Sequence, residues 1–210
     1  SNLVNASISF GQFSTTDSFG TKSQVKITTL PLSYTLRNDL DPRRQLQVSI
    51  PLSQADVNGA KTYSGGFGLA YRLPMNDNWT LVPSGRISGV GSLDLATVAG
   101  VSTVGLTSVY MWELGNYNVA MGNMLNVNAS MKFKSGSYAF DPGVRNTVTR
   151  NGLMLSQPVM VQGTKMSMEY SVIDTRYLSG VKPFINNFQE IGVTLGTNKS
   201  ALTSRSFFRA

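Results

Sequence analysis

The stretch YNVAMGNMLNVNASMKF, residues 117–133, decides the fold because its character alternates with every residue. The odd-numbered positions are apolar except for Asn123, and the even-numbered positions are small or polar except for Met124. Successive side chains leave opposite faces of a strand, so a period of two predicts a long β-strand with one apolar and one polar face. A helix is disfavoured, because helical steps from Tyr117 fail at Asn128 and the stretch contains Gly122.

The same alternation recurs along the chain, for example in QLQVSIPLS (45–53) and GFGLAYRL (66–73). Segments rich in Gly, Asn, Asp and Pro separate these runs, which predicts an antiparallel up-and-down meander. About ten strands are expected, near 4–13, 24–37, 45–54, 64–73, 78–91, 98–113, 117–133, 150–161, 165–176 and 187–196. An eleventh is expected to begin at Ser204, and since no linker or change of composition divides the chain, residues 1–210 are predicted to form a single domain.

Composition excludes several kinds of function. The chain has no Cys and no His, which removes zinc sites and nucleophile–histidine catalysis, so we expect no enzyme, no metal and no cofactor. The net charge is +7, but the basic residues are scattered along the chain, and we expect no nucleic acid partner. Neither a membrane-spanning helix nor a signal peptide is evident in the sequence.

Two all-β architectures fit this pattern. A transmembrane β-barrel turns its apolar face to lipid, whereas a soluble, calycin-like β-barrel buries that face and binds a small apolar ligand. Only 14% of the residues are charged, and the face opposite the apolar one is small and hydroxylated, which favours a transmembrane barrel of about 10–12 strands. Exposed side chains at Leu69, Tyr71, Leu81 and Met121 would distinguish the membrane barrel from the soluble alternative.

Charged residues within the strands suggest two kinds of site. Arg72, Arg86 and Glu169 fall on the small, polar face and are candidate lumen-lining residues. They would either select anions or a small polar solute, or form salt bridges that plug the lumen. The segment VIDTR (172–176) is expected to end a strand, with Asp174 and Arg176 forming an ion pair at the rim of the barrel.

Basic residues expected in loops suggest contact with the phosphates of lipopolysaccharide, although a non-specific charge surplus explains them equally well. These residues are Arg43, Arg44, Lys61, Lys132, Lys134, Arg145 and Arg150.

Several longer segments resemble the solitary autotransporter-like β-barrel proteins of Gram-negative outer membranes. They are LPLSYTL (30–36), GFGLAYRLPMNDNWTLVPSGRISGVGSLDLA (66–96), FDPGVRNTVTRNGL (140–153), SVIDTRYLSG (171–180) and EIGVTLGTNK (190–199). The resemblance implies a barrel of usually twelve strands in the bacterial outer membrane, without an attached passenger. It also implies outer-membrane lipid, lipopolysaccharide and the barrel assembly machinery as partners.

The family continues into one or two more strands where this chain ends with SFFRA (206–210). We therefore expect either that the sequence is truncated, with the closing strand or strands missing, or that its barrel is open.

Overall fold

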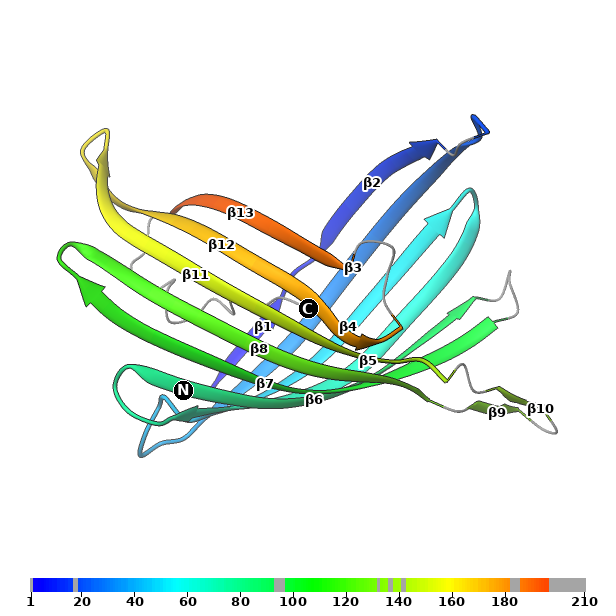
Figure 1. Ribbon diagram of the computed structural model, residues 1–210, viewed down its shortest axis with the longest axis horizontal. Helices are drawn as coiled ribbons and strands as arrows, with labels where there is room; N and C mark the ends of the chain where they lie inside the picture. The colour runs from blue at the N-terminus through cyan, green and yellow to red at the C-terminus, as the bar shows by residue number, and fades with distance from the viewer. Residues whose placement is uncertain are drawn as a thin grey trace. The chain divides into compact units, whose positions relative to one another are not determined.

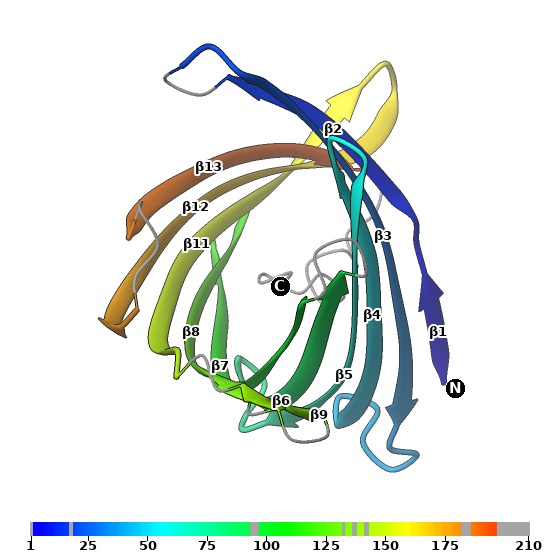
Figure 2. The same cartoon turned by 90° about the vertical axis from the view of Figure 1, so that its right-hand side faces the viewer.

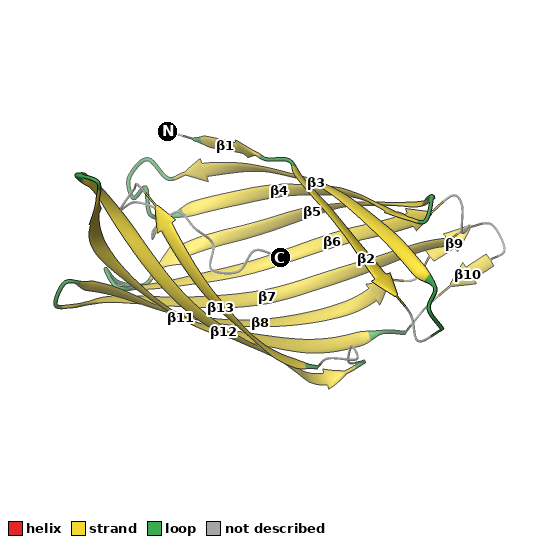
Figure 3. Ribbon diagram, turned by 90° about the horizontal axis from the view of Figure 1, so that it is seen from above, coloured by secondary structure: helices red, strands yellow, loops and turns green. Residues whose placement is uncertain are grey.

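The computed structural model describes residues 2–16, 19–92, 97–131, 133–135, 138–140, 143–181 and 186–196, and every regular element in them is a strand (Figures 1 and 3). The strands are β1 (Leu3–Ala6), β2 (Ser9–Thr16), β3 (Lys22–Arg37), β4 (Gln45–Val57), β5 (Ala60–Pro74), β6 (Trp79–Ser92), β7 (Thr97–Leu114), β8 (Tyr117–Met131), β9 (Phe133–Ser135), β10 (Tyr138–Phe140), β11 (Arg145–Val161), β12 (Thr164–Gly180) and β13 (Asn187–Gly196).

The strands form an up-and-down sheet in which, from β3 to β8 and from β11 to β13, neighbours in space are neighbours in sequence. Within the described residues the sheet has 11 strands in the order β1-β3-β4-β5-β6-β7-β8-β11-β12-β13, with β2 also paired to β3. Figure 2 shows the consecutive strands β11, β12 and β13 side by side. The predicted all-β meander is therefore confirmed.

Several details differ from the prediction. The first predicted strand (4–13) is split into β1 and β2, which pair with opposite halves of β3. The segment 134–143, expected to be a turn, contains most of the short hairpin formed by β9 and β10. The predicted strand 117–133 ends at Met131. The strand expected from Ser204 lies outside the described residues.

Two tight turns have the backbone conformation that hairpins favour. Asn58 and Gly59, between β4 and β5, have φ of 53° and 94°, and Gln162 and Gly163, between β11 and β12, have φ of 48° and 77°. Positive φ at both central residues matches the right-handed twist of the paired strands. Asn58 also accepts a hydrogen bond from the backbone N–H of Gln24 through its Oδ1 (2.8 Å), which ties this turn to β3.

The strands contribute to two compact units. The first unit comprises Ser1–Arg72, Ser84–Val104 and Asn128–Arg145, and the second comprises Leu73–Pro83, Gly105–Val127 and Asn146–Ala210. The prediction of a single domain stays a prediction.

Candidate membrane-facing surface and polar faces

The first unit carries an apolar face on β3, β4 and β5. Cross-strand register aligns its side chains in rows perpendicular to the strands, and most of these side chains are exposed. Four successive rows are Leu36–Leu46–Tyr71, Tyr34–Val48–Leu69, Leu32–Ile50 and Leu30–Leu52–Gly65, and Phe67 lies on β5 between Leu69 and Gly65. At about 3.3 Å per residue they cover about 20 Å of strand between first and last row, close to the ~25 Å apolar band of membrane barrels once the edge side chains are added.

Polar residues border these four rows on both sides. Beyond Leu30 the next rows are Thr28–Gln54–Tyr63 and Lys26–Asp56–Lys61. On the other side, β3 ends one residue after Leu36 and enters the hairpin loop 38–44. The apolar rows of the first unit are therefore a band with sharp limits.

The second unit repeats this arrangement on β11, β12 and β13. Its four rows are Leu153–Val172–Ile191, Leu155–Tyr170–Val193, Gln157–Met168–Leu195 and Val159–Met166. They are bordered by the polar row Asn151–Asp174–Gln189 on one side and by the row Val161–Thr164, in which only Thr164 is polar, on the other. We call the four rows of each unit its apolar band.

The exposed fractions bear directly on the soluble alternative. Leu69, Tyr71 and Met121 are 44%, 36% and 41% exposed, and Leu81 is half-buried. A calycin-like protein would bury these side chains, so the exposure of Leu69, Tyr71 and Met121 favours the membrane barrel over the soluble alternative. Val119 is an exception on β8, since it is buried although it belongs to the apolar positions of that strand.

Aromatic residues of the second unit gather where β6 begins and β7 ends. Trp79 donates a hydrogen bond from its indole Nε1 to Ser108 Oγ (2.9 Å). The rings of Tyr110 and Trp112 lie 5.8 Å apart. Membrane barrels concentrate amphipathic rings at the edge of their apolar band, so this cluster is typical of a membrane interface.

The polar face of the first unit has little room for side chains. A Cβ at Gly66 would lie 2.7 Å from the carbonyl oxygen of Ile87, and a Cβ at Gly68 would lie 2.6 Å from Ser49 Oγ and 3.6 Å from Arg86 Cγ. Small residues are therefore required here by atoms of the adjacent strands β4 and β6.

The polar face of the second unit buries hydroxyl and charged groups. Ser156 and Ser167 form a 2.8 Å hydrogen bond, and Glu169 is only 7% exposed. Arg72 and Arg86 belong to the first unit and Glu169 to the second, so their joint role in lining a lumen stays a prediction. Arg72 and Glu169 each interact with other residues.

A charged pair on this face was missed by sequence reasoning. Arg150, expected in a loop, lies inside β11, and its Nη2 is 2.7 Å from Glu190 Oε2 on β13. The prediction for Arg150 as a loop residue is wrong. The sequence held a signal for this placement, because Arg150 shares its alternate positions with the small residues Gly152 and Ser156. In the structure both of these residues are buried.

Among the other basic residues expected in loops, Lys61 lies in β5 and Arg145 begins β11. Lys132 lies outside the described residues, and Lys134 lies in β9.

Asp174 and Arg176 form an ion pair on the exposed side of β12, with Arg176 Nε 2.7 Å from Asp174 Oδ2. The expectation that the strand ends there is wrong, because β12 continues to Gly180. Gln189 donates to Asp174 (3.4 Å), and Asn123 donates to Asn151 (2.7 Å), which is the register partner of Asp174. A polar row thus borders the apolar band of the second unit, while its place at a barrel rim stays a prediction.

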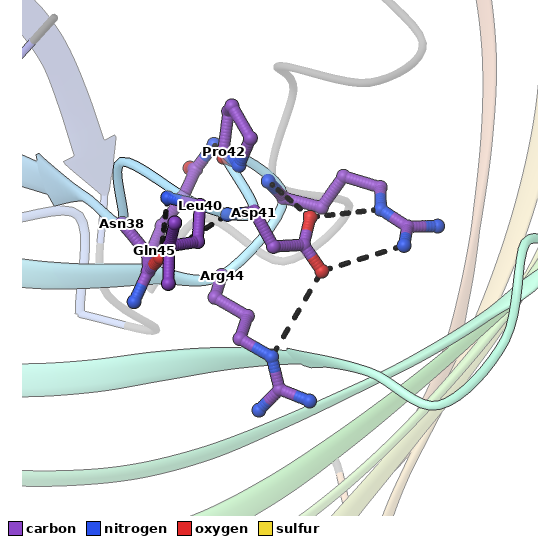
Figure 4. A network of polar contacts seen from close by, with 7 residues as sticks. Asn38, Leu40, Asp41, Pro42, Arg44 and Gln45 are labelled. Carbon is purple, nitrogen blue, oxygen red and sulfur yellow. Dashed lines mark hydrogen bonds and ion pairs between the residues drawn. The ribbon is translucent and has the colours of Figure 1, made fainter.

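The hairpin loop between β3 and β4 is organised by Asp41 (Figure 4). Its carboxylate accepts hydrogen bonds from Arg43 Nε (3.0 Å), Arg43 Nη2 (3.3 Å) and the Arg43 backbone N–H (3.2 Å). Arg44 Nε lies 3.9 Å away. The hydrogen bonds from Arg43, with the charges of both arginines, hold the pKa of Asp41 below its ordinary value of 3.8.

Two kinds of feature are absent from the described part of the chain. No group of three or more acidic residues is placed to hold a metal ion. Among the same residues, no helix has the length and apolar character needed to cross a membrane.

Comparisons with known proteins agree with this geometry at the level of the fold. The chain matches no protein-family model and no curated protein sequence. Its structure is similar to the crystal structure of the β domain of the Bordetella autotransporter BrkA, with a TM-score of 0.53 and 12% identity over 92% of this chain and 83% of that one. The fold is therefore that of an autotransporter-like β-barrel, and the resemblance found in the sequence is confirmed at that level.

Proposed function

We propose that this chain is a β-barrel of the bacterial outer membrane, with its apolar bands against lipid and its polar faces toward the barrel interior. The observation that carries the proposal is that, in both units, exposed apolar rows occupy one face of the strands and small or polar residues occupy the opposite face. Leaving such rows in water would cost about 25 cal/mol for each Å² of apolar surface. Lipid as their solvent removes that cost.

The proposed role is structural and non-enzymatic, and it concerns the barrel itself, whatever is attached to it. Interior charges held in pairs are stiffening elements, because each member satisfies the other in a region of reduced solvation. Arg150 and Glu190 form such a pair, and Arg72 and Glu169 both have interacting partners. These interactions favour the interpretation in which the charges fill the interior over the one in which they select solutes.

The proposed lipid partners follow from the apolar band and from the charged row beyond it. Lys26 and Lys61 stand with Asp56 in the second row beyond the band of the first unit, where lysine ammonium groups can reach lipid or lipopolysaccharide phosphates. Lipid contacts the band itself. The barrel assembly machinery is proposed as the partner for insertion, in line with the fold.

Behaviour in water and in lipid tests this proposal. We expect the full-length protein to fractionate with outer membranes, to fold in detergent micelles or lipid vesicles, and to aggregate in plain buffer. The folded fraction is measured by the shift in electrophoretic mobility between unheated and boiled samples and by circular dichroism. A folded, monodisperse monomer in detergent-free buffer would overturn the proposal.

A narrow pore is the second candidate function, because Arg86 lies on the polar face of the first unit beside Gly68. Conductance across planar bilayers decides between the two roles, and the structural role predicts no steady current. If the barrel conducts, Arg86→Ala should change the anion-to-cation permeability ratio. The matched control Arg43→Ala, in the exposed hairpin loop, should leave that ratio unchanged.

A further inference from the structure

Two arginines and a glutamine stand side by side at one end of the polar face of the first unit. Arg37 on β3 is the register partner of Gln45 on β4, and Gln45 is also the register partner of Arg72 on β5. Each of the three is the chain neighbour of a residue in the apolar row Leu36–Leu46–Tyr71, so their side chains leave the opposite face of the sheet. We call these three residues the arginine row.

The spacing of the arginine row suits an anion held from two sides. Neighbouring strands lie about 4.8 Å apart, which places the backbones at Arg37 and Arg72 about 10 Å from each other, with Gln45 between them. Gln45 Nε2 donates to the Pro42 carbonyl (3.0 Å), which ties the middle side chain to the hairpin loop. A guanidinium presents a fixed fork of N–H donors that matches the oxygens of a phosphate or a carboxylate.

Arg37 holds a buried donor that lacks an acceptor. Its Nε has no hydrogen-bond partner among the described residues, whereas its backbone N–H bonds Asn2 Oδ1 (3.4 Å). A buried polar group that stays unpaired costs free energy, and the cost is higher for a charged group. Arg72 interacts with another residue, but a guanidinium carries five N–H donors and can bind a second acceptor as well.

The polar face next to the arginine row adds positive charge. The next two rows on this face are Thr35–Gln47–Ala70 and Ser33–Ser49–Gly68, and neither contains a carboxylate. Arg86 lies beside the second of them, since a Cβ at Gly68 would be 3.6 Å from Arg86 Cγ. Arg37 and Arg72 are both half-buried, and guanidinium groups partly removed from water are stabilised by an anion.

The adjacent hairpin loop supplies acidic groups that are engaged elsewhere or face water. The Asp41 carboxylate is 3.0 Å from Arg43 Nε and 3.9 Å from Arg44 Nε. Asp39 is exposed. The loop therefore brings two arginines along with its two aspartates, and the positive charge of the arginine row remains to attract an anion.

We propose that the arginine row binds a phosphate group, with the guanidinium groups of Arg37 and Arg72 holding it from opposite sides. A tetrahedral phosphate presents oxygens to both sides at once, whereas the two oxygens of a carboxylate point the same way. The row faces away from the apolar band, so the ligand is a solute in water, either free phosphate or a small phosphorylated molecule, and not a lipid headgroup. This site goes beyond the structural role proposed above.

Titration of the full-length protein with inorganic phosphate tests the site. The protein is folded in maltoside micelles, in buffer and detergent without phosphate, and binding is measured by isothermal titration calorimetry at constant ionic strength. We expect one phosphate per chain, and Arg37→Gln and Arg72→Gln should each weaken binding by about tenfold or more, because a charge-assisted hydrogen bond is lost. Lys22→Gln is the matched control, because it removes the same charge at the exposed, opposite end of β3 and should leave binding unchanged.

Arg37→Lys separates hydrogen bonding from charge. It keeps the positive charge but has no Nε–H fork, so it should weaken phosphate binding nearly as much as Arg37→Gln. Phosphatidylglycerol added to the micelles should not displace phosphate. The inference is overturned by wild-type protein that binds no phosphate, by displacement with phosphatidylglycerol, or by equal weakening in Lys22→Gln and Arg37→Gln. Heat-shifted mobility confirms that each variant is folded, and a wild-type protein that does not fold in micelles overturns the proposed function instead.

Discussion

Arg150 on β11 and Glu190 on β13 form an ion pair across the strand that lies between them. Arg150 is the register partner of Thr175 on β12, and Glu190 is the register partner of Ile173, so the guanidinium reaches diagonally over β12 to the carboxylate, with 2.7 Å between Nη2 and Oε2. The Arg150 side chain is 18% exposed and that of Glu190 49%. The pair fastens β13 to a strand with which it shares no ladder hydrogen bonds.

Removing this pair should loosen β13. A double-mutant cycle of Arg150→Ala and Glu190→Ala should give a coupling energy of about 1 kcal/mol, measured by urea unfolding in lipid vesicles, because the pair is only partly shielded from water. The exposed pair Asp174–Arg176 is the matched control and should give about 0.5 kcal/mol or less. Strictly additive effects of the Arg150 and Glu190 substitutions would contradict a stabilising pair.

Adding a methyl group at Gly66 should destabilise the first unit. The new Cβ would lie 2.7 Å from the Ile87 carbonyl oxygen, so β5 or β6 must shift, and we expect a loss of about 1–3 kcal/mol in the free energy of unfolding. Gly85→Ala is the control, because its Cβ meets nothing within 4 Å. It should be neutral or stabilise by about 0.4–1 kcal/mol through the unfolded state. Equal effects at the two positions would argue against close strand contact at Gly66.

A charge placed along β4 should report the limits of the apolar band. Ile50→Arg, within the band, should make folding into vesicles less favourable by about 2–4 kcal/mol, because the guanidinium enters hydrocarbon. Gln54→Arg, on the same face beyond the band, should cost about 0–1 kcal/mol. Reversible folding in vesicles measures both. Similar costs at the two sites would show that lipid does not cover Ile50.

The β3–β4 hairpin should lose its organisation in acid. Hydrogen bonds from Arg43 lower the pKa of Asp41 in the folded protein, so this carboxylate stabilises the folded hairpin above its unfolded pKa near 3.8. That contribution is lost as the pH falls through the lowered, folded pKa. Carboxyl ¹³C NMR titration of the protein in micelles measures the shift, and Arg43→Ala should move the Asp41 midpoint upward. An unchanged midpoint in that variant would rule out the arginine as the cause.

Most of the strands were predictable because the signal for a strand is local. Alternation in 45–53 and 66–73 needs only the period of the pleated chain, and both segments lie in strands, β4 and β5. The short hairpin of β9 and β10 was not predicted, because its two strands are too short for alternation to stand out from the Gly- and Ser-containing sequence around them. The end of β12 at Gly180 was not predicted, because the point at which a strand ends depends on its pairing with the neighbouring strand.

The sequence by itself determined that this protein is a meander of two-faced strands, with Leu69, Tyr71 and Met121 on the apolar side and Gly68 on the other. That follows from a period of two, which each strand carries independently of its neighbours. Only the tertiary structure decided that Arg150 reaches Glu190, that Gly66 lies against the Ile87 carbonyl, and that the apolar rows line up near one end of β3 and β12. These relations depend on register, which is fixed when strands distant in sequence pair with one another, because a shift of one residue would exchange the faces of a whole strand.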